Sequence, residues 1–232
     1  MTDASEHDTA TAGDSTGILF IAAGKPFVHA AIAAAESAKA VMPGIAVDLY
    51  CDDAHGFDMS VFDKVTMIDA PHRRSKVDCL PMTRFDRTLY VDTDVRFVAD
   101  VRDLFELLDR FDVALAHAHT RNREVTTAVW RTALPDAFPQ FNGGVILYKS
   151  NEPVMAFLNA WKEAYKTAGF RKDQVTLREL LWESELQICT LPPEYNVRYR
   201  KYLWIWKKTE AQPRILHFAS FHRQSVKKVG QG

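Results

Sequence analysis

The sequence predicts a single α/β domain with a mostly parallel central sheet and helices on both of its faces. Short strand-like segments alternate with segments of helical spacing along most of the 232 residues. The hydrophobic fraction is 47% and there is no long low-complexity tract, so the chain is long enough to build one sizeable core. We expect residues 17–223 to form this domain, with a disordered tail at 1–16 and a basic tail at 224–232.

Composition and charge exclude several classes of protein. The formal net charge of -1 argues against a nucleic-acid binder, which needs a strongly basic surface. The three cysteines are widely spaced and odd in number, which fits neither a disulfide framework nor a paired-cysteine zinc site. No apolar run is as long as a membrane span, and the first residues lack a basic leader followed by an apolar stretch. We therefore expect a cytoplasmic protein.

The first third of the chain predicts strands and helices in alternation. After the first strand, Ala23 and Gly24 turn the chain, and Pro26 stands where a first helical turn tolerates proline. The alanine-rich helix that follows is stopped by Pro43 and Gly44. The expected elements are strand Ile18–Ala22, helix Phe27–Val41, strand Ile45–Tyr50, a weaker strand Lys64–Ile68 and a short helix near Ser75–Pro81.

A buried strand at Thr88–Val91 ends in Asp92-Thr93-Asp94, and we expect the function to lie there. Side chains two positions apart on an extended chain point to the same side, so the two acids can converge. Two carboxylates at the end of a buried strand are costly to desolvate unless a cation compensates them, and divalent ions prefer oxygen ligands. Alternatively, they are turn acids ahead of helix Val101–Arg110, where Asp100 is the better N-cap.

The rest of the chain continues the alternation. Residues 120–140 have no clean period and predict a loop that could cover a site. Gly143 and Gly144 then precede a strand and let a ligand approach the backbone closely, although a plain turn would look similar. The remaining expected elements are strand Asp112–Ala116, helices Pro153–Thr167 and Lys172–Glu183, and strands Leu186–Leu191 and Ile215–Phe218.

Histidines and aromatic residues suggest further sites. His117 and His119 alternate and could bind zinc, but no cysteine or acid stands beside them at ligand spacing, so they also fit a pocket lining or the surface. The segment Arg198–Lys208, here called the basic aromatic segment, mixes tyrosine and tryptophan with arginine and lysine. It suits a sugar-stacking platform or contact with anionic lipid. A half-buried strand with a basic solvent face explains the same composition.

Several motifs in a fixed order resemble the family-8 glycosyltransferases, the group of glycogenin and the bacterial lipopolysaccharide galactosyl- and glucosyltransferases. The resemblance spans Gly17 to Arg223 and implies the A-type nucleotide-sugar transferase fold. The motifs are Lys76 ahead of Leu-Tyr-Val-Asp-Thr-Asp, then Phe-Asn-Gly-Gly-Val, Asp-Gln, Tyr-Asn and Leu-His-Phe. The family usually ends in His-x-x-Gly-x-x-Lys-Pro-Trp. Here Ser220 and Arg223 replace the glycine and the lysine, and Pro-Trp is absent. The chain therefore departs from the family at the residues expected to clamp the diphosphate and to face the acceptor.

The resemblance implies a metal-dependent, retaining transfer of a hexose from a UDP-linked sugar to a saccharide or lipid-linked acceptor. Asp92, Asp94 and His217 would hold Mn²⁺ or Mg²⁺. Asn142, Asp173 and Gln174 would be catalytic, with Asp173 and Gln174 at the donor sugar and the reacting carbon. Separately from the resemblance, the composition of the basic aromatic segment suggests contact with the inner face of the membrane. The expected donor-binding residues, in addition to the metal ligands, are Ala22, Ala23 and Asp52 at the nucleoside, and Lys76, Thr93, Gly143 and Arg223.

The residue types support this chemistry independently, because a divalent ion that bridges both phosphates neutralises the charge on a leaving nucleoside diphosphate. A phosphatase of the haloacid dehalogenase type also uses Asp-x-Asp after a strand. That motif normally follows the first strand and has threonine or valine at its fifth position, where this chain has Arg96. The second alternative is a sugar-nucleotide-binding module that has kept the fold and lost activity.

Overall fold

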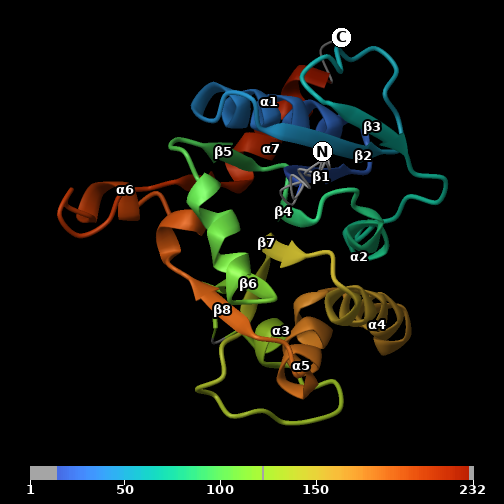
Figure 1. The fold of residues 1–232 in the computed structure, drawn as a ribbon, viewed down its shortest axis with the longest axis vertical. Helices are drawn as coiled ribbons and strands as arrows, with labels where there is room; N and C mark the ends of the chain where they lie inside the picture. Colours follow the sequence, from blue (N-terminus) through green and yellow to red (C-terminus); the bar gives the residue numbers. More distant parts are fainter. Residues whose placement is uncertain (1–14, 122, 230–232) are drawn as a thin grey trace, which may run out of the picture.

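A central seven-stranded sheet with helices on both faces forms the protein, as the computed structural model of residues 15–121 and 123–229 shows (Figure 1). The strand order is β3-β2-β1-β4-β7-β6-β8, and only β7 runs antiparallel to its neighbours. The predicted α/β fold class is therefore confirmed. The strands are β1 (Thr16–Ala22), β2 (Ala46–Cys51), β3 (Lys64–Met67), β4 (Arg87–Val91), β6 (Val113–His117), β7 (Phe141–Lys149) and β8 (Ile188–Leu191).

Each face of the sheet is covered by its own group of helices, because the central strands are apolar on both sides. On β1, Ile18 and Phe20 face one core and Leu19 and Ile21 face the other. The first core is closed by α1 (Lys25–Val41) and the 3-10 helix η2 (Arg102–Asp109), and α7 (Ala219–Val229) packs on α1. The second is closed by α2 (Lys76–Cys79), η1 (Leu80–Met82), α4 (Glu152–Ala168) and α5 (Gln174–Glu183).

A second, two-stranded sheet joins two distant parts of the chain. The strand β5 (Val95–Phe97) pairs antiparallel with β9 (Ile215–His217), and Val95 lies opposite His217. The backbone N–H of Phe218 also donates to the carbonyl of Asp94 over 3.0 Å. This pairing was not predicted from the sequence, and it carries His217 to the end of β4.

The structure differs from the sequence-based predictions at four places. The helix expected at Val101–Arg110 is the 3-10 helix η2, which begins at Arg102 with Val101 at its N-cap position, and the Asp100 carboxylate accepts a hydrogen bond from the backbone N–H of Arg102. Gly143 and Gly144 lie inside β7 rather than before it. The basic aromatic segment is not a strand but contains the helix α6 (Tyr202–Ile205), which follows η3 (Pro193–Asn196).

The fourth difference concerns the end of the domain. Residues 224–229, expected to be a basic tail, belong to α7, where Ser225 is buried and its hydroxyl lies 3.2 Å from His29 Nδ1. Of the tail expected at 1–16, residues 1–14 lie outside the described residues, and Thr16 already belongs to β1. Residues 230–232 of the tail expected at 224–232 also lie outside the described residues.

The predicted loop between β6 and β7 contains the short helix α3 (Glu124–Thr127) and is tied to α5 by one buried carboxylate. Glu179 is 3% exposed and accepts hydrogen bonds from the backbone N–H groups of Trp130, Arg131 and Thr132. Three donors on one carboxylate satisfy its buried charge and fix the turn at these residues. The loop is therefore anchored beside the helix that begins with Gln174.

We expect Glu179→Ala to lower the free energy of unfolding by about 2 kcal/mol, because three backbone donors lose a charged acceptor. Limited proteolysis should then cut first between residues 120 and 140. Glu183→Ala is the matched control, because Glu183 lies one turn later on the same helix and forms an exposed ion pair with Arg131. That control should lose less than about 1 kcal/mol. Equal losses in the two variants would contradict the anchoring role.

Candidate active site

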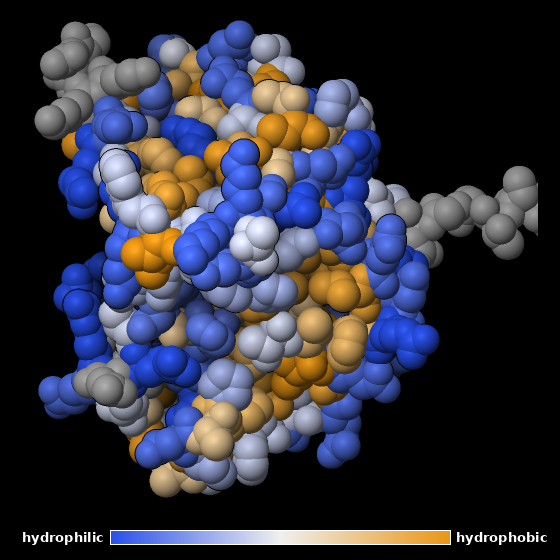
Figure 2. Space-filling view, turned by 90° about the vertical axis from the view of Figure 1, so that its left-hand side faces the viewer, coloured by the Kyte–Doolittle hydropathy of each residue, from blue (hydrophilic) through white to orange (hydrophobic). Residues whose placement is uncertain are grey.

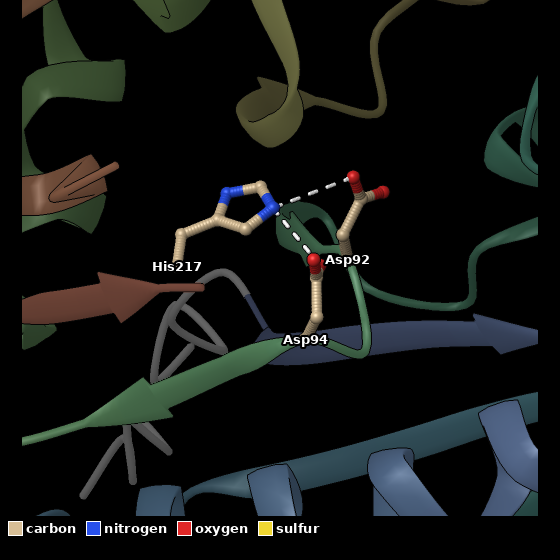
Figure 3. A group of neighbouring side chains, drawn as sticks. All are labelled: Asp92, Asp94 and His217. Atoms are coloured by element: carbon tan, nitrogen blue, oxygen red, sulfur yellow. Dashed lines mark ion pairs between the residues drawn. The ribbon is translucent and has the colours of Figure 1, made fainter. Parts of the chain in front are cut away.

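Asp92, Asp94 and His217 come together at the end of β4 (Figure 3). One ligand atom of each residue lies within 4.8 Å of the others. His217 Nε2 is 2.9 Å from Asp94 Oδ1 and 3.8 Å from Asp92 Oδ2. Within the described residues, no other group of three such side chains is gathered closely enough to hold a metal ion. The fold thus brings together the three residues that the sequence analysis proposed as metal ligands.

His217 is held in the orientation that a metal ligand needs. The ring is 1% exposed, and its Nδ1 lies 2.8 Å from Asn196 Oδ1, so the ring proton belongs on Nδ1 and Nε2 faces the two acids. Burial opposes ionisation of Asp94, but His217 lowers the pKa of the Asp94 carboxyl to about 2. No role for Asn196 was predicted from the sequence, although the Tyr-Asn motif that carries the resemblance contains it.

The cluster fits a divalent ion. Two carboxylates and one imidazole offer the oxygen and nitrogen donors that Mn²⁺ and Mg²⁺ accept. The Tyr90 hydroxyl donates to Asp92 Oδ1 over 2.6 Å, and Asp92 Oδ2 is the oxygen nearer His217. A Cβ on Gly144 would lie 2.4 Å from the His217 ring and 2.5 Å from the Asp92 carboxylate. Glycine is therefore required at that position for the ligand groups to come together.

A buried ion pair lies next to the cluster. Lys76 Nζ is 2.9 Å from Asp173 Oδ2 and 3.6 Å from Asp92 Oδ1, and it donates to the carbonyl of Gly143 over 2.6 Å. Burial favours the neutral amine, but Asp173 and Asp92 raise the pKa of Lys76. Burial likewise opposes ionisation of Asp173, whose pKa is nevertheless lowered by Lys76 and then Arg74. Both groups of the pair are therefore charged at neutral pH.

Two adjoining cavities meet at this cluster. The larger one, of about 680 Å³, opens at the carboxyl ends of β1 and β2, where Asp52 accepts a hydrogen bond from the backbone N–H of Gly24. The smaller one, of about 350 Å³, lies on the side of β7 and α5. Both are lined by Arg74, Lys76, Asp92 and Asp94. The metal-ligand cluster therefore lies at the boundary between the two cavities.

The other predicted site residues divide between these cavities. Ala23, Asp52, Thr93 and Arg223 line the larger cavity, and Arg223 is exposed at its edge. The smaller cavity is lined by Asn142, Gly143, Asp173 and Gln174. Ala22 is fully buried and its side chain belongs to the core, so it could contact a nucleoside only through its backbone.

The suggested zinc site at His117 and His119 finds no third ligand among the described residues. The two rings are 6.1 Å apart. The His119 ring instead packs 5.2 Å from Tyr199 and 5.8 Å from Tyr202, and it lines the smaller cavity. The pocket-lining interpretation of His119 therefore agrees with the structure.

The chain belongs to the nucleotide-diphospho-sugar transferase family, whose profile matches residues 87–230. It is a member of a class of transferases whose A-type fold typically uses a nucleotide sugar and a divalent metal, and this confirms the predicted glycosyltransferase resemblance. A relationship to family 8 is consistent with these findings. No curated protein sequence matches the chain.

Solved structures show the same fold at low sequence identity. The galactosyltransferase LgtC, solved with donor and acceptor sugar analogues, is 16% identical with a TM-score of 0.59 over 93% of this chain and 95% of LgtC. Mouse xyloside xylosyltransferase 1 is 14% identical, with a TM-score of 0.57 over 87% and 97% of the two chains. The glycosyltransferase GlyE from Streptococcus pneumoniae TIGR4 is 17% identical, with a TM-score of 0.62 over 88% of this chain and 54% of GlyE.

Proposed function

We propose that the protein is a metal-dependent, retaining glycosyltransferase that moves a hexose from a UDP-linked sugar to an acceptor hydroxyl. The observation that carries this proposal is the position of Asp92, Asp94 and His217 between the two cavities. Ligands of open α/β sheets bind beyond the carboxyl ends of the strands, which is where the larger cavity opens. A nucleotide sugar would have its nucleoside there, its diphosphate at the cluster and its hexose in the smaller cavity.

Each group of residues has a role in this arrangement. A divalent ion, Mn²⁺ or Mg²⁺, held by Asp92, Asp94 and His217 would neutralise charge on the leaving diphosphate. Arg223 at the edge of the larger cavity adds a planar cation that can bind phosphate oxygens with two hydrogen bonds. Lys76 is already balanced by Asp173, so it positions that carboxylate and contributes less free charge to the diphosphate than the sequence suggests.

A screen of nucleotide sugars with Mn²⁺ tests the proposal through the release of nucleoside diphosphate. We expect release from a UDP-hexose that depends on added metal. Hydrolysis of simple phosphate esters would support the phosphatase alternative, which the family membership already disfavours. Binding of UDP-sugars without turnover in the presence of varied acceptors would support the inactive binding module.

We expect the transfer to retain the anomeric configuration of the donor. An inverting enzyme needs a general base on the face opposite the leaving group. Gln174 opens α5 and lines the smaller cavity, and an amide cannot take a proton at neutral pH. The leaving diphosphate would accept the acceptor's proton on its own face. An α-linked product from an α-linked UDP-sugar, identified by NMR, is the expected result, and a β-linked product would overturn this mechanism.

The basic aromatic segment is our proposed contact with a membrane on the acceptor side. On α6, Leu203, Trp204 and Ile205 are 41%, 86% and 59% exposed, and Lys201, Lys207 and Lys208 are exposed around them. Figure 2 views the side on which α6 lies and shows hydrophobic residues among hydrophilic ones. Exposed apolar side chains with flanking cations suit an anionic lipid surface. None of the helices in the described parts of the chain combines the length and apolar composition that spanning a bilayer requires.

We expect the protein to sediment with vesicles that contain phosphatidylserine, and binding should weaken as salt is raised. Trp204→Ala should reduce the bound fraction several-fold, because it removes the most exposed ring of the segment. Trp182→Ala is the matched control, because Trp182 is 47% exposed on α5, away from the segment. Binding that is absent or insensitive to salt would contradict the membrane role.

A further inference from the structure

The smaller cavity carries more positive charge than the proposed metal and donor would balance. A divalent ion carries two positive charges and a sugar-linked nucleoside diphosphate carries two negative charges. Together they leave the net charge of the cavity unchanged. The excess of cations over carboxylates among the lining side chains therefore remains two in the donor complex. The lining cations are Arg74, Lys76, Arg123, Lys172 and Arg198, and the carboxylates are Asp92, Asp94 and Asp173.

This excess charge lies away from the donor side. Asp173 lies 2.9 Å from Lys76 and 3.4 Å from Arg74, so the two cations that both cavities share already have a carboxylate partner. Lys172 and Arg198 line only the smaller cavity and are half-buried. Neither of them forms a salt bridge within the described part of the chain. Asp94 and Asp173 lie near Arg198 and Lys172, respectively, but neither carboxylate is close enough to form a salt bridge with them. Partly desolvated cations without a salt-bridge partner attract an anionic group strongly.

Two titratable groups register the same positive potential. The pKa of Lys172 is lowered by burial and then by the nearby Arg74. The pKa of His119 is lowered to about 4 by burial, then by His117 and Arg198. At neutral pH His119 is therefore uncharged, and both of its buried ring nitrogens lack a hydrogen-bond partner among the described residues. They are available to the hydroxyl groups of a ligand.

An aromatic ring stands beside the cations. Tyr199 follows Arg198 directly, lines the same cavity, and has its ring 5.2 Å from that of His119 at an angle of 82°. Tyrosine and histidine rings provide flat apolar surfaces with polar edges, which suit a sugar ring. Arg198 and Tyr199 follow closely after Asn196, whose side chain orients His217. This wall of the cavity is therefore joined to the metal-ligand cluster.

We propose that the smaller cavity binds an acceptor saccharide that carries an anionic group, a phosphate or a carboxylate, and that Arg198 and Lys172 bind this group. The inference rests on the proposed function, because it takes the smaller cavity to be the sugar side of the site. Arginine binds either anion through two parallel hydrogen bonds, and lysine adds a compact charge. A sugar ring against Tyr199 would hold its anionic substituent beside Arg198.

The test uses the full chain with Mn²⁺ and saturating UDP, so that the donor side is occupied. Calorimetric titrations with methyl α-glucoside, its 6-phosphate and methyl α-glucuronoside compare a neutral probe with two anionic ones. We expect at least one anionic probe to bind at least tenfold more tightly than the neutral probe. The tighter of the two identifies the acceptor as phosphate-bearing or as a uronic acid. Circular dichroism and UDP affinity are measured on every variant.

Arg198→Gln and Lys172→Gln should each reduce this preference at least threefold. Arg171→Gln is the matched control, because Arg171 carries the same charge next to Lys172 but is exposed and outside the cavity lining. Equal affinity for neutral and anionic probes, or a preference that survives in both variants, would overturn the inference. Tighter binding of UDP-glucuronate than of UDP-glucose that depends on Arg198 and Lys172 would also overturn it, because the anionic group would then belong to the donor.

Failure of the proposed function and failure of the acceptor inference give different results. If the wild-type protein does not bind UDP with Mn²⁺, the proposed function is wrong. If UDP binds normally and the anionic probes have no advantage, only the nature of the acceptor is wrong.

Discussion

Replacement of Asp94 by alanine is expected to abolish the transfer that Mn²⁺ supports. Asp94 is the carboxylate closest to His217, with 2.9 Å between Oδ1 and Nε2, and its low pKa keeps it ionised at neutral pH. Its loss would leave one carboxylate and one imidazole for the ion. Because the ion's stabilisation of the leaving diphosphate is worth several kcal/mol, we expect a loss of roughly 1,000-fold or more in the rate of nucleoside diphosphate release.

Two measurements separate loss of the ion from loss of the fold. Mn²⁺ binding, followed by electron paramagnetic resonance, should weaken in Asp94→Ala, while the circular dichroism spectrum stays that of the wild type. Asp100→Ala is the control, because this surface acid pairs with Arg102 and lies outside the cluster. It should keep both metal binding and activity. A variant lacking Asp94 that still binds Mn²⁺ and still transfers sugar would remove the cluster from the mechanism.

The central strands were predictable because burial on both faces makes them apolar throughout. The runs at Ile18–Ala22 and Thr88–Val91 lie in β1 and β4 within the middle of the sheet. The position of His217 was not predictable from local pattern. It depends on the pairing of β5 with β9. The strand β5 is only three residues long and follows directly after Asp92-Thr93-Asp94, so its sequence has no recognisable strand pattern. Only the order of motifs connected His217 with Asp92 and Asp94 before the structure did.

The basic aromatic segment shows how a pattern can indicate the wrong element. Tyr202, Trp204 and Trp206 alternate as in a strand, but a strand also needs a neighbour to pair with. The chain forms one helical turn instead, in which the rings of Tyr202 and Trp206 stack with centroids 4.9 Å apart. The spacing of these aromatic residues fits both the two-residue period of a strand and the i, i+4 contact of a helix. Local composition therefore could not decide between strand and helix.

The ion pair between Lys76 and Asp173 was likewise invisible in the sequence, because it joins residues far apart in the chain and both are buried. From the sequence, Lys76 is expected at the donor and Asp173 at the donor sugar. In the structure the two side chains hold each other, and Trp161 Nε1–H donates to the carbonyl of Asp173 over 3.1 Å. The pair therefore supports the fold as well as the site.

Asp173→Asn is expected to lower stability and activity together. Removing one partner of a buried pair leaves the other charge poorly compensated, so the free energy of unfolding should fall by about 3 kcal/mol in denaturant titrations. The folded-state pKa of Asp173 is lowered and that of Lys76 is raised. The stabilisation by the ion pair is therefore lost only as the pH falls through the folded-state pKa of Asp173 or rises through that of Lys76. The difference from wild type should stay constant between about pH 6 and pH 8.

Asp78→Asn is the comparison for stability, because Asp78 is only half-buried and pairs with His72, Lys162 and Lys166, all of which are partly exposed. It should cost less than about 1 kcal/mol.

Kinetics then separate Asp173 from its neighbour Gln174, which follows it in the chain and lines the same cavity. Asp173→Asn should raise KM and lower kcat, since the carboxylate would bind donor-sugar hydroxyls before and during the reaction. Gln174→Ala should lower mainly kcat and leave stability almost unchanged, because its amide is half-buried and would act on charge that develops at the reacting carbon. If Gln174→Ala instead raised KM with kcat unchanged, the amide would be a sugar-binding group, and its role in the reaction would be lost.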